Sequence, residues 1–192
     1  MTQIVLGSSS PFRKALLSRI LDQFETCSPD IDESPLPDEP PQQLVQRLSQ
    51  EKARAVAVHY PDALIIASDQ VSVLNGRING KPGNFDNAMA QLKASSGQTV
   101  TFYTGLSLYH AKSQSMDSVI EPFQVHFRTL SEAAIRRYLE KETPFNCAGS
   151  FKSEGLGIAL FESMEGNDPN ALIGLPLIQL VQMLARQGVQ IP

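Results

Sequence analysis

Short apolar runs and amphipathic stretches alternate along the first part of this chain. Residues 3–7, Gln-Ile-Val-Leu-Gly, predict a short buried strand. Apolar residues then recur at helical spacing behind Ser10-Pro11, a hydroxyl residue and a proline that are typical of a helix start. Residues 29–41 contain five prolines and five acidic residues, which neither a helix nor a sheet tolerates, so this segment predicts a loop.

The rest of the chain continues the alternation of strands and helices. The next elements are predicted as a helix at 41–59, strands at 63–67 and 71–74 interrupted by Ser68-Asp69-Gln70, and a helix at 84–95 capped by Asn84. They are followed by strands at 98–109 and 119–129 joined by a polar tip at 111–118, a helix at 131–141, a Gly-rich turn at 155–161 that leads into a strand, and a closing helix at 175–187. Asn75-Gly76 is a hairpin signal. Strands interleaved with helices and hairpins indicate an α/β domain with a mixed sheet.

Composition narrows the class of protein but not its function. The 192 residues predict a single domain, and 42% hydrophobic residues with a net charge of −4 exclude general disorder and a polycationic nucleic-acid binder. We expect no membrane span, because no apolar run has the required length. Cys27 and Cys147 show no paired spacing and are expected to be reduced thiols, so we expect a cytoplasmic protein without a signal peptide.

Two polar clusters follow buried strands, where binding sites are often built. Ser8-Ser9-Ser10-Pro11 leads into a helix whose first turn carries Arg13, an arrangement that suits a phosphate but also fits a capped helix with a solvated arginine. Asp69 directly follows the apolar run 63–67, where a carboxylate needs a cation or a donor. It can hold a metal, accept a proton or bond the backbone of a turn.

Other charged residues are less specific by themselves. The segment around Gly80-Lys81-Pro82 has the wrong spacing for a P-loop, and a proline stands where the magnesium-binding hydroxyl would be. Lys81 therefore remains a candidate phosphate contact. Glu33 in the acidic loop and Glu51-Lys52 on the next helix are equally typical of a solvated face. The histidines show no metal-ligand spacing.

Taken in order, these clusters resemble the Maf-like nucleotide pyrophosphatases. The motifs that carry the resemblance are Ser8–Arg13, Asp32-Glu33, Glu51-Lys52-Ala53, Ser68-Asp69-Gln70, Gly80-Lys81-Pro82, the segment from Cys147 to Gly155 and the segment from Gly166 to Pro176. They extend over nearly the whole chain. Gln70 and Glu154 resemble the 7-methyl-GTP pyrophosphatase subfamily more than the dTTP/UTP group. The chain departs from that pattern at Phe12, where members of the subfamily carry Trp.

The resemblance implies a fold and an activity for the whole chain, 1–192. The fold is the inosine-triphosphatase-like α/β fold, an elongated mixed sheet with two lobes around a central cleft. The activity is that of a hydrolase acting on phosphoric anhydride bonds, which splits 7-methyl-GTP into 7-methyl-GMP and pyrophosphate and removes modified nucleotides. A divalent cation, Mg²⁺ or Mn²⁺, is implied as cofactor, and the family commonly forms homodimers.

The resemblance also assigns roles to individual residues. Cations hold the phosphates, helped by a serine, while two carboxylates bind the metal. These are Arg13, Lys52, Lys81 and Ser8 for the phosphates, and Glu33 and Asp69 for the metal. Asp69 is the implied proton acceptor for the attacking water, and base and metal roles are not separable from sequence. A 7-methylguanine ring is cationic, so Phe12, Glu154 and Gln70 are the implied contacts of the base.

Three other functions remain compatible with these residues. A related pyrophosphatase could act on dTTP, UTP or other non-canonical nucleotides. An aspartyl-nucleophile phosphatase would use Asp69, but it needs a second acid where this chain has Val71. A nucleotide-binding regulator of division would bind a triphosphate without turnover.

Overall fold

The protein is described by a computed structural model that covers residues 2–192. Its strands form one seven-stranded mixed sheet in the order β2-β1-β3-β5-β6-β7, and β4 pairs with β3. The strands are β1 (Ile4–Leu6), β2 (Glu25–Thr26), β3 (Leu64–Leu74), β4 (Arg77–Asn79), β5 (Thr99–His110), β6 (Ser115–Phe127) and β7 (Phe161–Gly166). The helices are α1 (Pro11–Leu17), α2 (Pro41–Ala57), α3 (Phe85–Ser95), α4 (Glu132–Glu142), α5 (Pro169–Ile173) and α6 (Leu177–Arg186), with short 3-10 helices at Ala148–Ser150 and Leu156–Leu160.

The chain divides into two compact units, each assembled from separate segments. The first unit contains residues 1–69, 104–121 and 168–192, and the second contains 70–103 and 122–167. Both units include parts of β3, β5 and β6. Among residues 2–192, no helix is long and apolar enough to cross a membrane.

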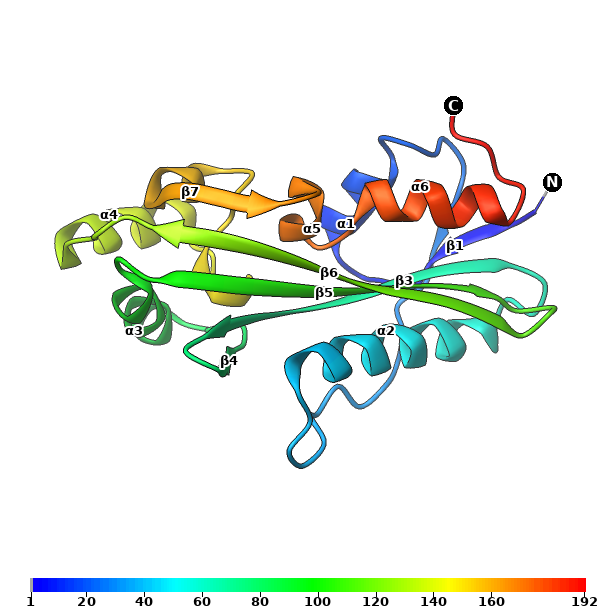
Figure 1. The fold of residues 1–192 in the computed structure, drawn as a ribbon, viewed down its shortest axis with the longest axis horizontal. Helices are drawn as coiled ribbons and strands as arrows, with labels where there is room; N and C mark the ends of the chain where they lie inside the picture. The colour runs from blue at the N-terminus through cyan, green and yellow to red at the C-terminus, as the bar shows by residue number, and fades with distance from the viewer. Residues whose placement is uncertain (1) are drawn as a thin grey trace. The chain divides into compact units, whose positions relative to one another are not determined.

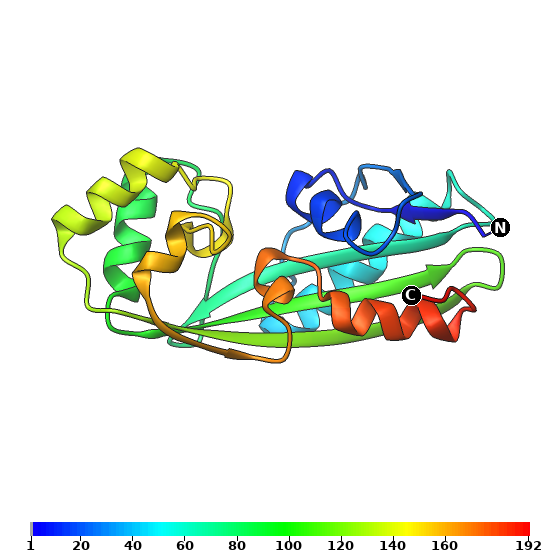
Figure 2. The same cartoon turned by 90° about the horizontal axis from the view of Figure 1, so that it is seen from above.

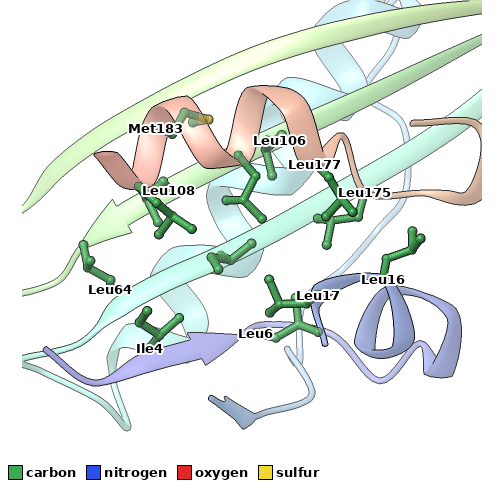
Figure 3. Packing of buried hydrophobic residues seen from close by; sticks show 13 residues of the cluster. Ile4, Leu6, Leu16, Leu17, Leu64, Leu106, Leu108, Leu175, Leu177 and Met183 are labelled. Carbon is green, nitrogen blue, oxygen red and sulfur yellow. The ribbon is translucent and has the colours of Figure 1, made fainter. Parts of the chain in front are cut away.

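In the first unit, helices cover both faces of the sheet. Figure 1 shows α2 along one face, with α1 and α6 on the other. Alternate residues of β3 explain this arrangement, because successive side chains of a strand point to opposite faces. Leu64 and Ile66 belong to the core beneath α1 and α6 (Figure 3), whereas Ile65 and Ala67 pack against the apolar side of α2.

Helix α2 lies unusually close to β5. A methyl group added at Gly105 would collide with the backbone carbonyl of Val45, so only glycine allows this approach. Beside it, the hydroxyl of Ser107 lies 2.8 Å from that of Ser49 on α2 and 2.9 Å from that of Ser118 on β6. These hydroxyls satisfy one another in an otherwise apolar contact, and together with Gly105 they fix the position of α2 on the sheet.

The second unit has its own apolar centre. Figure 2 shows α3 and α4 side by side, and α3 also contacts the 3-10 helix at Ala148–Ser150. Phe151 lies edge-to-face against three other rings, those of Phe102, Phe127 and Phe161, with centroids 4.8–5.6 Å away. These aromatic contacts hold the segment after residue 147 against the strands of this unit.

Most predicted elements are confirmed, including the α/β class with a mixed sheet. The predicted interruption of the strand at Ser68-Asp69-Gln70 is wrong, because β3 runs without a break from Leu64 to Leu74. The polar residues stay in the strand because they have partners: Ser68 Oγ donates to the carbonyl oxygen of Gly174, and Asp69 accepts from Lys52. The predicted polar tip at 111–118 is also shorter, since β6 already begins at Ser115.

Candidate active site

The candidate site begins where β1 ends beside its parallel neighbour β3. β1 pairs with β3 in the register Leu6↔Ile66, and the amide of Gly7 donates to the carbonyl oxygen of Ile66 at 2.7 Å. Ser8 then turns away from the strand direction, since its amide donates to the carbonyl oxygen of Leu6 at 3.0 Å, while β3 continues through Ser68 and Asp69. Only β1 ends here, and the carboxyl end of a parallel strand is the usual place for a ligand site in an α/β sheet.

Lys52 lies at the centre of the charged residues. It is on the face of α2 that packs against the sheet, and only 6% of its side chain is exposed. Its Nζ lies 2.7 Å from Oδ1 of Asp69 and 3.1 Å from Oε2 of Glu33. A buried ammonium needs such partners, since burial of an unpaired charge is costly. One ammonium therefore holds the two predicted carboxylates together.

The two carboxylates differ sharply in their exposure. The side chain of Asp69 is 9% exposed, whereas that of Glu33 is 56% exposed because it lies in the irregular loop before α2. Asp32, next to Glu33, stabilises the loop itself, since its carboxylate accepts a hydrogen bond from the amide of Ser34 at 2.9 Å. Asp69 is thus fixed by the sheet, while the position of Glu33 depends on how the loop is held.

Arg13 is anchored through one nitrogen of its guanidinium group. Its Nε donates to the carbonyl oxygen of Gly174 at 2.9 Å, and Ser68 Oγ donates to the same oxygen at 2.9 Å. Among residues 2–192, its two terminal nitrogens have no hydrogen-bond partner, so both can reach a phosphate. Burial lowers the pKa of Arg13, and the carboxylates of Asp69 and Glu33 oppose that shift. Arg13 therefore shares the electrostatic environment of the Lys52 cluster.

The helix start at Ser10 is confirmed, and it uses several amides that a phosphate would otherwise bind. Ser10 Oγ accepts from the amide of Arg13 at 3.4 Å, while Ser8 Oγ accepts from the amide of Ser10 at 3.1 Å. The amides of Ser10 and Arg13 are consequently already bonded within this turn. Phe12 is half-buried in the same first turn of α1.

The remaining predicted residues belong to the second unit. Gln70 is half-buried in β3, whereas Lys81 and Glu154 are exposed in loops. Lys81 and Glu154 both act electrostatically on Cys147: burial raises the pKa of this thiol, Glu154 raises it further, and Lys81 lowers it. These two residues therefore share one neighbourhood of the second unit. The structure brings Arg13, Glu33, Lys52 and Asp69 together in the first unit, whereas the side chain of Ser8 bonds the amide of Ser10 before α1.

The residues fit a hard divalent cation only in part. Carboxylate oxygens are the ligands that Mg²⁺ and Mn²⁺ prefer, and Glu33 and Asp69 each place one carboxylate oxygen beside the ammonium group of Lys52. No group of three or more His, Cys, Asp or Glu residues able to hold a metal occurs in the described range 2–192. A cation here would need further oxygen ligands, and Mg²⁺ usually takes these from substrate phosphates and water.

Sequence reasoning missed two parts of this site. It assigned no role to Ser68 or to Gly174, although their hydrogen bond and that of Arg13 join α1, β3 and the segment after α5. The motif from Gly166 to Pro176 was the signal in the sequence that could have indicated this part of the site, because its asparagine, proline and glycine residues are typical of a turn with a defined backbone conformation. Asp168 caps α5 by accepting from the amide of Asn170 and accepts from the amide of Ile178 at the start of α6.

Comparisons with known proteins agree on family and fold. A family model described as Maf-like protein matches residues 3–187. A protein of Vibrio vulnificus (strain CMCP6) named 7-methyl-GTP pyrophosphatase is 57% identical over 189 residues, covering 98% of this chain and 97% of its own. The solved Ham1 protein of Staphylococcus aureus has a TM-score of 0.56 and 12% identity, covering 97% of this chain and 100% of its own. The last likeness concerns the fold alone and confirms the predicted inosine-triphosphatase-like class.

Proposed function

The chain belongs to the Maf-like protein family, and on that premise we propose that it hydrolyses 7-methyl-GTP to 7-methyl-GMP and pyrophosphate. It is a hydrolase acting on phosphoric anhydride bonds. The observation that carries this function is the pairing of buried Lys52 with Asp69 and Glu33 beside Arg13. Such a cluster supplies both a proton acceptor and cations for a phosphate, which are the two requirements of this reaction.

In the proposed reaction, water attacks the phosphorus of the α-phosphate and the bond to the bridging oxygen of the β-phosphate breaks. Asp69 accepts the proton of the attacking water, and Lys52, whose Nζ lies 2.7 Å from Oδ1 of Asp69, fixes the position of this carboxylate. The leaving pyrophosphate takes the electron pair of the broken bond. Arg13 and Lys81 stabilise the charge that develops on it, and Ser8 adds a hydroxyl contact.

A divalent cation is proposed as cofactor because the first-unit cluster has no surplus positive charge. Lys52 and Arg13 are balanced by Glu33 and Asp69, whereas the triphosphate is a polyanion. Glu33 and Asp69 are the residues that would hold Mg²⁺ or Mn²⁺. When bound, such a cation neutralises phosphate charge and orients the reacting groups.

Selection of the methylated base is assigned to Phe12, Gln70 and Glu154. Methylation at N7 makes the guanine ring cationic, which favours an aromatic face and a carboxylate. Phe12 lies in the first turn of α1, next in sequence to Arg13, and it is half-buried. Phenylalanine attracts a cation less strongly than tryptophan does, so this position limits how sharply the chain separates 7-methyl-GTP from GTP.

The experiment is a substrate profile with the purified protein in Mg²⁺ or Mn²⁺. We expect pyrophosphate release from 7-methyl-GTP to exceed that from GTP, dTTP and UTP. Preference for dTTP or UTP would contradict the base assignment and leave the family reaction in place. Release of inorganic phosphate would instead support the aspartyl phosphatase, and binding without any turnover would support a regulator. Phe12→Trp provides a matched variant that should increase the preference for the methylated base.

Two further proposals concern assembly and location, the first from the family resemblance and the second from the unpaired cysteines. We propose a homodimer, which light scattering coupled to gel filtration tests directly. We also propose a cytoplasmic location, which cell fractionation tests. Because the net charge is −4, binding to a nucleic acid polyanion is not expected, and a mobility-shift assay with RNA should be negative.

A further inference from the structure

One arginine of α2 joins the loop that carries Glu33 to the helix that carries Lys52. We propose that Arg47 is a positioning residue for Glu33, acting through what we term the Arg47 clamp: Arg47 with Glu39, Glu51 and the carbonyl oxygen of Ser34. The inference rests on the proposed function, because it gives Arg47 a role in nucleotide hydrolysis. Neither Arg47 nor Glu39 belongs to the motifs that predicted the site.

The first part of the clamp is a two-bond contact with Glu39. Arg47 Nε lies 2.6 Å from Glu39 Oε1, and Nη2 donates to Glu39 Oε2 at 2.9 Å. Two parallel bonds between a guanidinium and a carboxylate fix orientation as well as distance. Oε2 of Glu39 also accepts from the amide of Leu36, so the carboxylate is bonded to its own loop. These contacts hold the pKa of Glu39 well below its ordinary value, at about 2.

The second part of the clamp reaches the residue next to Glu33. Arg47 Nη2 donates to the carbonyl oxygen of Ser34 at 3.0 Å. This part of the loop has no helix or strand hydrogen bonds of its own, and more than half of the Glu33 side chain is exposed. The backbone beside Glu33 therefore depends on the guanidinium group of Arg47 for its position.

The third part of the clamp connects Arg47 to the segment of α2 that carries Lys52. Arg47 Nη1 lies 3.1 Å from Oε2 of Glu51, and Glu51 precedes Lys52 in α2. Lys52 Nζ in turn lies 3.1 Å from Oε2 of Glu33. One guanidinium group thus contacts the sequence neighbour of each member of the Glu33–Lys52 pair. A solvated arginine would not be expected to make contacts to both segments at once, since each contact costs side-chain freedom.

These contacts distinguish a positioning role of Arg47 from a purely structural role. If the guanidinium fork is lost, Glu33 leaves Lys52 while the sheet still holds Asp69. Lysine at this position keeps the charge but cannot make the paired contact with Glu39 or reach Ser34 and Glu51 at the same time. Arg47→Lys and Arg47→Gln should both lower kcat by about 10- to 100-fold, the effect expected from a small displacement of a reacting group. Arg54→Lys, an exposed arginine on the same helix, is the matched control.

The decisive experiment is a double-mutant cycle read by kcat for 7-methyl-GTP and by hydrogen exchange. In a Glu33→Gln background, Arg47→Lys should cause little additional loss, because its effect passes through Glu33. If the two losses multiply, Arg47 does not act through Glu33 and the inference is overturned. Amide exchange in residues 32–36 should be faster in Arg47→Gln than in Arg54→Lys, and equal rates would also overturn it.

The same measurements distinguish failure of the clamp from failure of the proposed function. If the wild-type protein releases no pyrophosphate from 7-methyl-GTP, the proposed function is wrong. Hydrogen exchange then still decides whether Arg47 holds the loop. If the wild type is active and Arg47→Gln matches it in both kcat and loop exchange, the clamp is wrong and the hydrolase assignment stands.

Discussion

Asp69 and Glu33 bind the same ammonium group, but their substitution should affect stability very differently. Asp69→Asn removes the buried partner of Lys52, whose side chain is only 6% exposed. Removing one partner of a buried ion pair costs about 3–5 kcal/mol, and because Glu33 still faces Lys52 we expect the lower end, about 3 kcal/mol. For a chain of 192 residues this corresponds to a fall in Tm of about 6–12 °C.

Glu33→Gln removes a carboxylate that is 56% exposed, so solvent already screens most of its interaction with Lys52. Its cost should be below about 1 kcal/mol, a fall in Tm of no more than about 4 °C. The losses of activity should not follow the order of the losses of stability. Both variants lose turnover, and Asp69→Asn loses about 10²- to 10⁴-fold, as expected for a general base.

The assay combines calorimetric unfolding of both variants with initial rates of pyrophosphate release. Asp62→Asn, an exposed carboxylate just before β3, serves as the control for introducing an amide. Equal losses of Tm in Asp69→Asn and Glu33→Gln would refute the reasoning from burial. Full activity in Asp69→Asn with a lowered Tm would leave the ion pair as structural and remove Asp69 from the base role.

Further predictions address packing, pH and a buried carboxylate. Gly105→Ala should destabilise by about 3 kcal/mol in urea unfolding, the upper end for overpacking, because the methyl group meets a carbonyl of α2, while Gly80→Ala, in open space, should be nearly neutral. The pKa of Glu39 is lowered from 4.5 to about 2, so its stabilisation is present above pH 4.5 and is lost as pH falls toward 2. The difference in unfolding free energy between wild type and Glu39→Gln should therefore shrink as the solution is acidified; a constant difference would contradict the pairing with Arg47. Glu121 Oε1 is buried with no hydrogen-bond partner among residues 2–192, so Glu121→Met should stabilise by about 1 kcal/mol, and an unchanged or lower Tm would contradict this.

The helix caps and the hairpin turn were predicted correctly from the sequence because the groups that interact in them lie within a few residues of one another. Ser10 caps α1 and Asn84 caps α3, each by accepting from an amide three residues later. Asn75 and Gly76 both have positive φ, at 51° and 76°, as the hairpin between β3 and β4 requires. In each case a few adjacent residues contain the complete interaction, so the sequence pattern predicts it.

The predicted interruption of the strand at Ser68-Asp69-Gln70 was wrong because the partners of Ser68 and Asp69 lie far away in the sequence. Polar residues next to an apolar run look like the end of a strand when their partners are unknown. The partners of Ser68 and Asp69 are 106 and 17 residues away, at Gly174 and Lys52. Only the folded chain brings them together, and they let the strand continue with polar residues at 0% and 7% exposure.

The same limit applies to the candidate site. Family resemblance gathered Arg13, Glu33, Lys52 and Asp69 into one set, and the structure brings these side chains together. Neither resemblance nor spacing indicated Arg47, because its contacts in the acidic loop depend on how residues 34–39 fold back on α2. Residues that position a reacting group are harder to predict than the group itself, since many side chains could serve and only geometry selects one.

The carbonyl oxygen of Gly174 has a consequence for the order in which the contacts of Arg13 form during synthesis. It anchors both Ser68 and Arg13, and it lies 161 residues after Arg13. A nascent chain that has emerged only as far as α4 already contains every predicted phosphate-binding residue, yet its Arg13 has nothing to hold its Nε. The contact that fixes Arg13 therefore forms only after the segment that contains Gly174 has left the ribosome.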